Sequence, residues 1–320
     1  MGFRQAFLKG FLLKNPPSCT AALVCAMCSL MNTNCASASA LPENSRFRLI
    51  EKEIEKEKTL AMPRYPVVLV HGISVHDRKS VLDPWGRIPE VLRGQGVSVY
   101  FGNTDAWGGF ESNALILKQT IETVLRETGA LKVNLIAHSK GGLDCRFLIW
   151  RHDFGGKIAS LTTISTPHRG AELADAVSAR KIIYTLPARA LVKLAGLCSG
   201  DASPDIYQAL HDLTTENMRR FNEEVAMDKQ VFYQSLYTVM RRPADGWIFM
   251  PTYLYIKKIR GPNDGIVSEW SSRWGENPRK IQGQGISHAD ILDIRKRQVS
   301  GVDIPALYLA LVHELSAKGF

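Results

Sequence analysis

One serine of this sequence lies in a setting that suits nucleophilic catalysis. Ser139 is the centre of the segment AHSKG (137–141), which follows a run with buried-strand character and precedes a helix-like run. At such a strand-to-helix turn the hydroxyl is exposed, and the flanking residues must be small because strand and helix nearly touch. Ala137 departs from the usual glycine but is small. The pattern predicts Ser139 as a nucleophile.

Two backbone N–H groups are expected to stabilise the negative charge that develops when the serine attacks a carbonyl carbon. The N–H of Lys140 lies at the amino end of the following helix, where it favours an anion. The His71-Gly72 pair ends an early strand and opens the loop from which a second donor comes, and by position this donor is Ile73. An ordinary strand-ending turn is the alternative interpretation of His71-Gly72.

The acid and the base should follow the serine in the chain, in the order nucleophile, acid, histidine. Asp264 lies in a turn-rich loop, GPNDG (261–265), after an expected strand, and His288 lies on a loop ahead of the last helix. A buried carboxylate behind the imidazole fixes its tautomer and stabilises the imidazolium. We therefore predict Asp264 as the orienting acid and His288 as the base.

Other residues compete for these two roles. Asp245, Asp290 and Asp293 are rival acids, each also suited to a turn, a helix cap or the surface. His313 falls among apolar residues of the last helix, as a structural histidine would, and His168 precedes Asp264 and breaks the expected order.

Strand and helix patterns alternate along the chain. The expected strands are Val67–Val70, Val97–Phe101, Val133–Ala137, Ile158–Ile164 and Tyr253–Ile256, and the expected helices are Glu111–Gly129, Leu143–Arg151 and Pro305–Leu315. This alternation predicts an α/β fold with a doubly wound, mostly parallel sheet and helices on both faces.

The first forty residues differ from the rest. Three basic residues precede a short apolar run (21–30) and a small-residue stretch, ASASA (36–40), which is typical of a cleaved export signal. We expect a signal peptide over 1–40, a charged connector over 41–62 and the α/β domain over 63–320, hence a secreted or periplasmic protein. A membrane anchor is the alternative for the leader. Four of the six cysteines lie in it, so no disulfide framework is implied.

The net charge of +9 is spread over the chain without a basic stripe, so nucleic acid is not an expected partner. Several ordered segments instead resemble the secreted bacterial triacylglycerol lipases. The similarity runs from Tyr65 to about Asp290 and rests on YPVVLVHG (65–72), WGGFESN (107–113), AHSKGG (137–142), STPHRG (165–170), NDGIV (263–267) with Ser271 and Ser272, and SHAD (287–290).

This resemblance implies an α/β-hydrolase fold and an ester hydrolase with Ser139, Asp264 and His288 as its triad. It implies lipid or other ester substrates at a lipid–water interface, and no cofactor for the reaction. Many relatives hold a structural calcium, for which Asp290 and, more loosely, Asp245 are the candidates here, although Ile294 replaces a glutamine of that site. Lys140 replaces an apolar residue or glutamine, so altered chemistry at the rim of the site is expected. A folding helper is left open.

A mobile cap is expected over roughly 171–212. Thr185 to Gly196 has the pattern of an amphipathic helix that could serve as a lid, and the alternative is a helix packed on the sheet. A short-chain esterase, thioesterase or amidase is the nearest rival function, because the triad does not choose the substrate. An inert hydrolase-fold protein that binds lipid or a partner is the rival from another class.

Overall fold

The computed structural model describes residues 62–73, 77, 84–179, 201–202, 204–276, 278–283 and 285–320. The expected export signal, almost all of the charged connector and the expected lid helix lie outside the described residues. Met62–Phe320 forms one compact unit. Among the described residues, no helix is both long and apolar enough to cross a bilayer.

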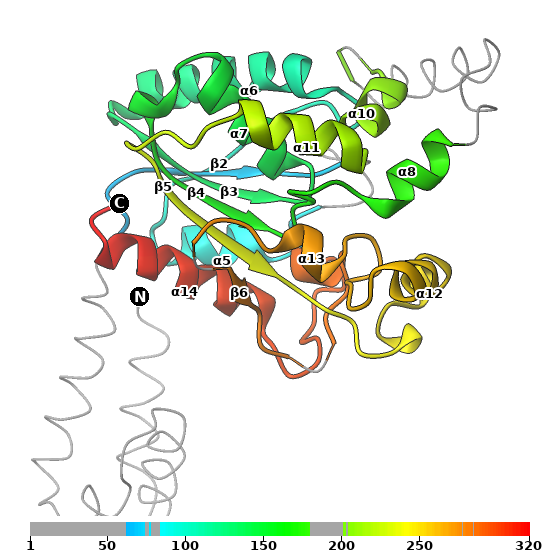
Figure 1. The fold of residues 1–320 in the computed structure, drawn as a ribbon. Helices are drawn as coiled ribbons and strands as arrows, with labels where there is room; N and C mark the ends of the chain where they lie inside the picture. The colour runs from blue at the N-terminus through cyan, green and yellow to red at the C-terminus, as the bar shows by residue number, and fades with distance from the viewer. Residues whose placement is uncertain are drawn as a thin grey trace, which may run out of the picture. The chain divides into compact units, whose positions relative to one another are not determined.

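A parallel β-sheet lies at the centre of the fold, with six strands in the described part of the chain and the order β2-β1-β3-β4-β5-β6 (Figure 1). The strands are β1 (Val67–Val70), β2 (Val99–Phe101), β3 (Val133–His138), β4 (Ile158–Ile164), β5 (Phe232–Tyr237) and β6 (Arg279–Lys280). β1 pairs with β2 on one side and with β3 on the other. The strand order therefore reverses between β1 and β3, and in such sheets ligands bind beyond the carboxyl ends of the strands at this point.

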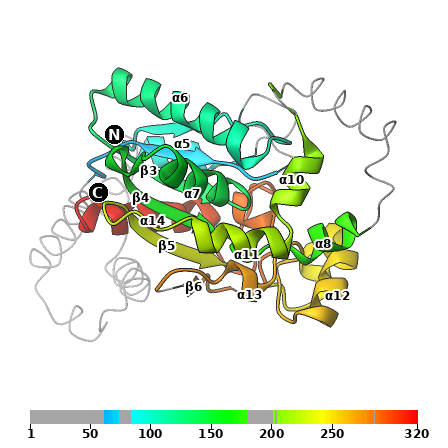
Figure 2. The same ribbon diagram turned by 45° about the horizontal axis from the view of Figure 1, so that its top comes forward.

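Helices cover both faces of the sheet (Figures 1 and 2). One face carries α5 (Ile88–Gly94) and α14 (Ile304–Ala317), and the other carries α6 (Phe110–Thr128), α7 (Gly141–Arg151) and α11 (Thr215–Glu224). The remaining elements are α8 (Glu172–Ser178), α10 (Ile206–Asp212), α12 (Met250–Ile259), α13 (Glu269–Ser272) and the 3-10 helices η1 (Gly155–Lys157), η3 (Pro243–Phe249) and η4 (Asp290–Leu292).

Burial explains why these segments adopt these elements. All residues of β1, β3 and β4 are buried, as expected for central strands that helices cover on both sides. In α6, the buried side chains of Leu117, Ile121 and Val124 recur every three or four residues, and Gly129 ends the helix in the left-handed conformation, with φ of 68°. The predicted α/β-hydrolase architecture is confirmed.

One expected strand is wrong. Tyr253–Ile256 belongs to the helix α12, and the strand that precedes the Asp264 loop is β5, which the sequence patterns missed. Tyr253 and Ile256 are buried, whereas Leu254 and Tyr255 between them are exposed. Burial with a spacing of three residues is typical of a helix, and four consecutive apolar residues concealed this period.

The amino end of α7 lies against the end of β1. A Cβ atom on Gly141 would collide with the carbonyl oxygens of Val70 and His71, which are backbone atoms that cannot move aside alone. Gly141 therefore permits the distance between α7 and β1 that the turn at Ser139 requires.

We expect Gly141→Ala to lower the free energy of unfolding by about 2 kcal/mol or more, because the added methyl group overpacks this contact. Thermal or urea unfolding measures the effect. The control is Gly156→Ala, since a Cβ there meets nothing within 4 Å. Equal stabilities of the two variants would contradict the assigned role of Gly141.

Candidate active site

Ser139 lies at the turn between β3 and α7, in the strained backbone that its position predicts. Its φ is 53°, in the left-handed region that non-glycine residues rarely adopt. The Ser139 N–H donates to the carbonyl oxygen of Ile164 at the end of β4, at 2.9 Å. Packing and hydrogen bonds thus hold the strained turn.

His288 connects Ser139 to Asp264. Its Nε2 lies 3.0 Å from Ser139 Oγ, and its Nδ1 lies 2.8 Å from Asp264 Oδ2. Since a carboxylate only accepts, Nδ1–H donates to Asp264, and Nε2 is left to accept the hydroxyl proton of Ser139. The imidazole is 9% exposed and Asp264 is fully buried. The structure brings together the three residues that the sequence analysis chose.

The loop around Asp264 fixes the orientation of its carboxylate. The N–H groups of Ile266 and Val267 donate to Oδ1, at 3.0 and 2.8 Å, which leaves Oδ2 for His288. The His288 N–H also donates to the Asp264 carbonyl oxygen, at 2.9 Å. Gly265, with φ of 101°, permits the turn that folds these donors back.

The rival acids have other partners. Asp245 accepts the N–H groups of Arg241 and Arg242 in a cap of η3. Asp293 forms two hydrogen bonds with the Arg87 guanidinium. Asp290 accepts a hydrogen bond from the hydroxyl of Ser287, the residue before His288. Each carboxylate therefore orders a loop or a helix end.

The rival histidines are also placed as structural residues. His168 is buried, with Thr163 Oγ1 at 3.0 Å from Nε2, Arg146 Nη1 at 3.2 Å from Nδ1, and its ring stacked on Trp274. Burial lowers the pKa of His168 well below its ordinary value, and Arg146 adds to this effect. His313 is half-buried within α14.

The two expected N–H donors belong to Lys140, which follows Ser139 in the chain, and to Ile73, which follows Gly72. A Cβ on Gly72 would lie 2.6 Å from Ser139 Cβ, so only glycine lets the chain after β1 pass this close and reach Ile73. Lys140 is the N-cap residue of α7. N–H groups at a helix start have no intrahelical acceptor, so they favour an anion there.

The side chain of Lys140 does not lie at the rim of the site, so the expectation drawn from its charge is wrong. It is about 2% exposed, and its Nζ lies 2.6 Å from Oδ1 of Asp144, one helical turn further on. Asn113 Nδ2 donates to the other oxygen of Asp144, at 3.0 Å, and the ring of Phe110 lies over Nζ. The spacing of four residues places the ammonium beside Asp144 on the same side of α7, where it is buried.

His138 is a site residue that the sequence analysis did not single out. Its ring lies 4.6 Å from that of His288, and its Nε2–H donates to the His288 carbonyl oxygen, at 3.0 Å. Burial lowers the pKa of His138 well below its ordinary value, and the neighbouring His288 adds to this effect. His138 is thus neutral and fastens the loop of the base to β3. Its position beside Ser139 was the available signal.

The candidate calcium residues do not fit a calcium ion. Asp290 Oδ1 pairs with Arg295 Nε, at 3.0 Å, and its Oδ2 accepts the Ser287 hydroxyl. The Asp245 carboxylate accepts two backbone N–H groups and contacts Arg242 Nε, at 3.3 Å. Calcium needs six to eight oxygen ligands, whereas N–H and O–H donors already bond these carboxylate oxygens. Among the described residues, no cluster of three or more His, Cys, Asp or Glu side chains could hold a metal ion.

The expected cap is described at its two ends only. α8 begins it and α10 ends it, while 180–200 lies outside the described residues. Asp201 accepts the N–H groups of Ala106 and Trp107, at 2.9 and 3.0 Å, so the returning chain is fastened beside the WGGFESN segment.

The chain is similar to known lipases and thioesterases. The family model of palmitoyl protein thioesterase matches residues 66–235. Triacylglycerol lipase 2 of Saccharomyces cerevisiae is 30% identical over 260 residues, which cover 75% of each chain. A triacylglycerol lipase of Pseudarthrobacter phenanthrenivorans is 37% identical over 181 residues, 51% of this chain and 54% of that relative.

The fold is also similar to solved structures. The crystal structure of the mature Bacillus licheniformis lipase BlEst2 superposes with a TM-score of 0.59 over 79% of this chain and 92% of that one, at 21% identity. At this identity the match bears on the fold alone, which agrees with the parallel sheet described above.

Removal of the Lys140 ammonium should lower the free energy of unfolding, because the buried Asp144 then has no cationic partner. We expect Lys140→Met to destabilise the protein by about 3 to 5 kcal/mol, because Asp144 keeps a buried charge without its partner. The double variant Lys140→Met/Asp144→Leu should recover most of this loss in urea unfolding. A single variant as stable as the wild type would refute this account.

The carboxylate of Asp290 should depend on an arginine rather than on a metal ion. We expect a calcium chelator to leave the thermal midpoint and the activity unchanged, while Arg295→Gln lowers the midpoint, because the buried carboxylate loses its charged partner. Arg297→Gln is the control, an arginine two residues away. A midpoint that falls with chelator and returns with calcium would contradict the arginine account.

Proposed function

This chain belongs both to the triacylglycerol lipase family and to the palmitoyl protein thioesterase family, and we propose that it cleaves long-chain acyl esters through Ser139, His288 and Asp264. It is an ester hydrolase, and its relatives include lipases of bacteria and yeast. The observation that carries the residue assignment is the continuous chain of hydrogen bonds from Ser139 Oγ through His288 to Asp264.

The proposed reaction has two halves. Ser139 Oγ attacks the carbonyl carbon while His288 Nε2 takes the hydroxyl proton, and the imidazolium then returns this proton to the leaving alcohol. Water, deprotonated by the same histidine, then attacks the acyl-enzyme; the acyl–Oγ bond breaks, the imidazolium returns its proton to Ser139 Oγ, and the fatty acid leaves. Asp264 remains ionised and keeps the imidazole oriented. The N–H groups of Ile73 and Lys140 hold the oxyanion in both halves, each contributing about 3 kcal/mol.

The reaction as proposed uses no metal, redox or nucleotide cofactor, since every proton and electron pair moves between the substrate, water and the three side chains. We assign the protein to the cell exterior or the periplasm on the basis of its leader composition, in which a basic start, a short apolar run and ASASA follow in order.

A second candidate substrate is a long-chain acyl thioester. The match to the palmitoyl protein thioesterase family over more than half of the chain favours it. The same triad serves both substrates, because the attacked carbonyl is alike and a thiolate leaves more easily than an alkoxide. The ratio of rates on an oxygen ester and a thioester of the same acyl chain separates the two candidates.

We expect Ser139→Ala to reduce kcat/KM on p-nitrophenyl esters by about a thousandfold or more, and Asp264→Asn to reduce it strongly by loss of the correct tautomer. When kcat/KM is compared among butyrate esters, palmitate esters and palmitoyl thioesters, we expect the highest value on the palmitate ester.

Two matched controls sharpen this test. Ser112→Ala removes a hydroxyl that donates to the Gly109 carbonyl oxygen, and Asp293→Asn alters a rival acid whose carboxylate pairs with Arg87. Both should retain wild-type kcat. Retained activity in Ser139→Ala would exclude the nucleophile, and a preference for butyrate would point to a short-chain esterase.

A further inference from the structure

The segment from η3 to α12 exposes a large apolar surface. Among the described residues, twelve large apolar side chains are exposed, and six of them lie between residues 247 and 259. Trp247 is 71% exposed and Ile248 67%. The η3–α12 surface comprises Trp247, Ile248, Met250, Leu254, Tyr255 and Ile259. Soluble proteins rarely concentrate exposed apolar residues without a binding role.

The part of this surface that belongs to α12 is the outer face of a well-anchored helix. On the inner face, Tyr253 and Ile256 are buried, and the Tyr253 hydroxyl donates to the Arg241 carbonyl oxygen, at 3.0 Å. At the end of α12, Arg260 pairs with Glu172 of α8, at 3.0 Å. The helix therefore already has a packed side, and the η3–α12 surface is a second apolar side.

Basic residues border the η3–α12 surface. Residues 241–260 contain five cationic side chains, Arg241, Arg242, Lys257, Lys258 and Arg260, and a single carboxylate, Asp245, which contacts Arg242. Lys257 and Lys258 lie in the last turn of α12. A helix with tryptophan and leucine on one side and lysines beside them is typical of segments that lie in the interface of a bilayer.

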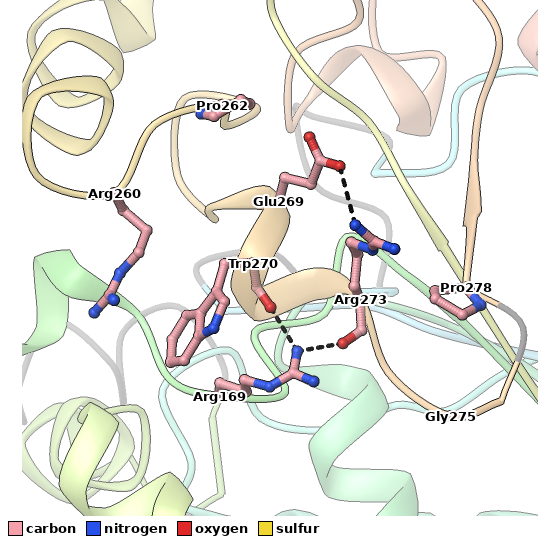
Figure 3. A pocket seen from close by; sticks show the side chains of 8 residues that line it. All are labelled: Arg169, Arg260, Pro262, Glu269, Trp270, Arg273, Gly275 and Pro278. Carbon is pink, nitrogen blue, oxygen red and sulfur yellow. Dashed lines mark hydrogen bonds and ion pairs between the residues drawn. The ribbon is translucent and has the colours of Figure 1, made fainter.

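A pocket of about 420 Å³ continues the basic character beyond α12 (Figure 3). Three arginines and one glutamate line it, together with Trp270. Two guanidinium groups lie over the Trp270 ring there, with the Cζ atoms of Arg260 and Arg169 at 4.3 and 5.5 Å from the ring centroid. Arg169 is held in place by the carbonyl oxygens of Trp270 and Arg273. Arg260 pairs with Glu172 and Arg273 with Glu269, at 3.0 and 3.8 Å, so the net positive charge that the pocket offers to an anionic headgroup is that of Arg169.

The surface borders the active site. A Cβ on Gly246 of η3 would lie 2.8 Å from Ser287 Cβ, next to the base, and a Cβ on Gly265, next to the acid, would lie 2.6 Å from Phe249 Cβ. η3 thus packs on the loops of both His288 and Asp264. A lipid layer bound at η3–α12 would lie beside the catalytic residues.

We propose that the η3–α12 surface binds an anionic lipid layer, with its apolar side chains among the acyl chains and its lysines and arginines at the headgroups. The charges disfavour two other occupants. A second copy of this face would bring two basic rims together, which repel. Residues 180–200 contain four basic residues and no acidic one, so that segment repels the same rim. This binding does not rest on the proposed function, because no bond is cleaved.

The test measures binding of the full chain to vesicles that it cannot hydrolyse. Ether-linked phosphatidylcholine vesicles, with and without ether-linked phosphatidylglycerol, lack the ester, so failure to bind is distinct from failure of catalysis. We expect stronger binding to the anionic vesicles. Leu254→Ser/Ile259→Ser should weaken it by about tenfold or more. Lys257→Gln/Lys258→Gln should remove part of the preference for anionic lipid.

The matched control is Leu131→Ser, an exposed leucine (71%) before β3, at the opposite end of the strands from the active site. It should bind as the wild type does. Each variant should retain its thermal midpoint and its rate on p-nitrophenyl butyrate, because the substituted side chains are exposed and outside the catalytic residues.

Hydrogen–deuterium exchange of the full chain locates the contact. Slower exchange of residues 247–260 with vesicles, and unchanged exchange around residue 131, supports the proposal. Protection elsewhere only, or undiminished binding of Leu254→Ser/Ile259→Ser, overturns it and assigns binding to another segment. A concentration-dependent dimer that these substitutions dissociate without vesicles also overturns it, because the surface would then join two copies of the chain.

Discussion

The close contact between the end of β1 and the start of α7 is the constraint on which the site depends. Gly72 lies against Ser139, and Gly141 lies against the carbonyl oxygens of β1. These two contacts force the turn between β3 and α7 to be tight, and Ser139 consequently adopts a φ of 53°. The same contacts bring the loop after β1 beside the helix start, where backbone N–H groups favour an anion.

Later segments of the chain complete the site around this contact. The Asp264 and His288 loops hold each other by a backbone hydrogen bond, and His138 of β3 holds the His288 carbonyl oxygen. η3 packs on both loops through Gly246 and Gly265. The loop of His288 is therefore held by β3, by the Asp264 loop and by η3. The same two catalytic loops also pack against η3, which leads into α12.

Buried charges in this protein serve the framework of the site. Lys140 and Asp144 form a buried ion pair in the first turn of α7, and the buried carboxylate of Asp290, two residues after the base, pairs with the exposed Arg295. Buried ion pairs contribute little to net stability, but a partner left alone is costly. Such pairs therefore hold the two loops that carry Ser139 and His288 in one arrangement.

The sequence by itself indicated the alternation of strands and helices and selected Ser139, Asp264 and His288 as the candidate triad, because these residues stand in local patterns that short-range sterics and chain order impose. Tertiary structure alone decided the rest. Tyr253–Ile256 became a helix since only two of its four residues found a core to pack against. Lys140 turned inward because Asn113 and Phe110, from α6, complete its buried site with Asp144. The Asp290 carboxylate pairs with Arg295, five residues further on. The first two outcomes depend on neighbours far away in the chain, which local patterns do not encode.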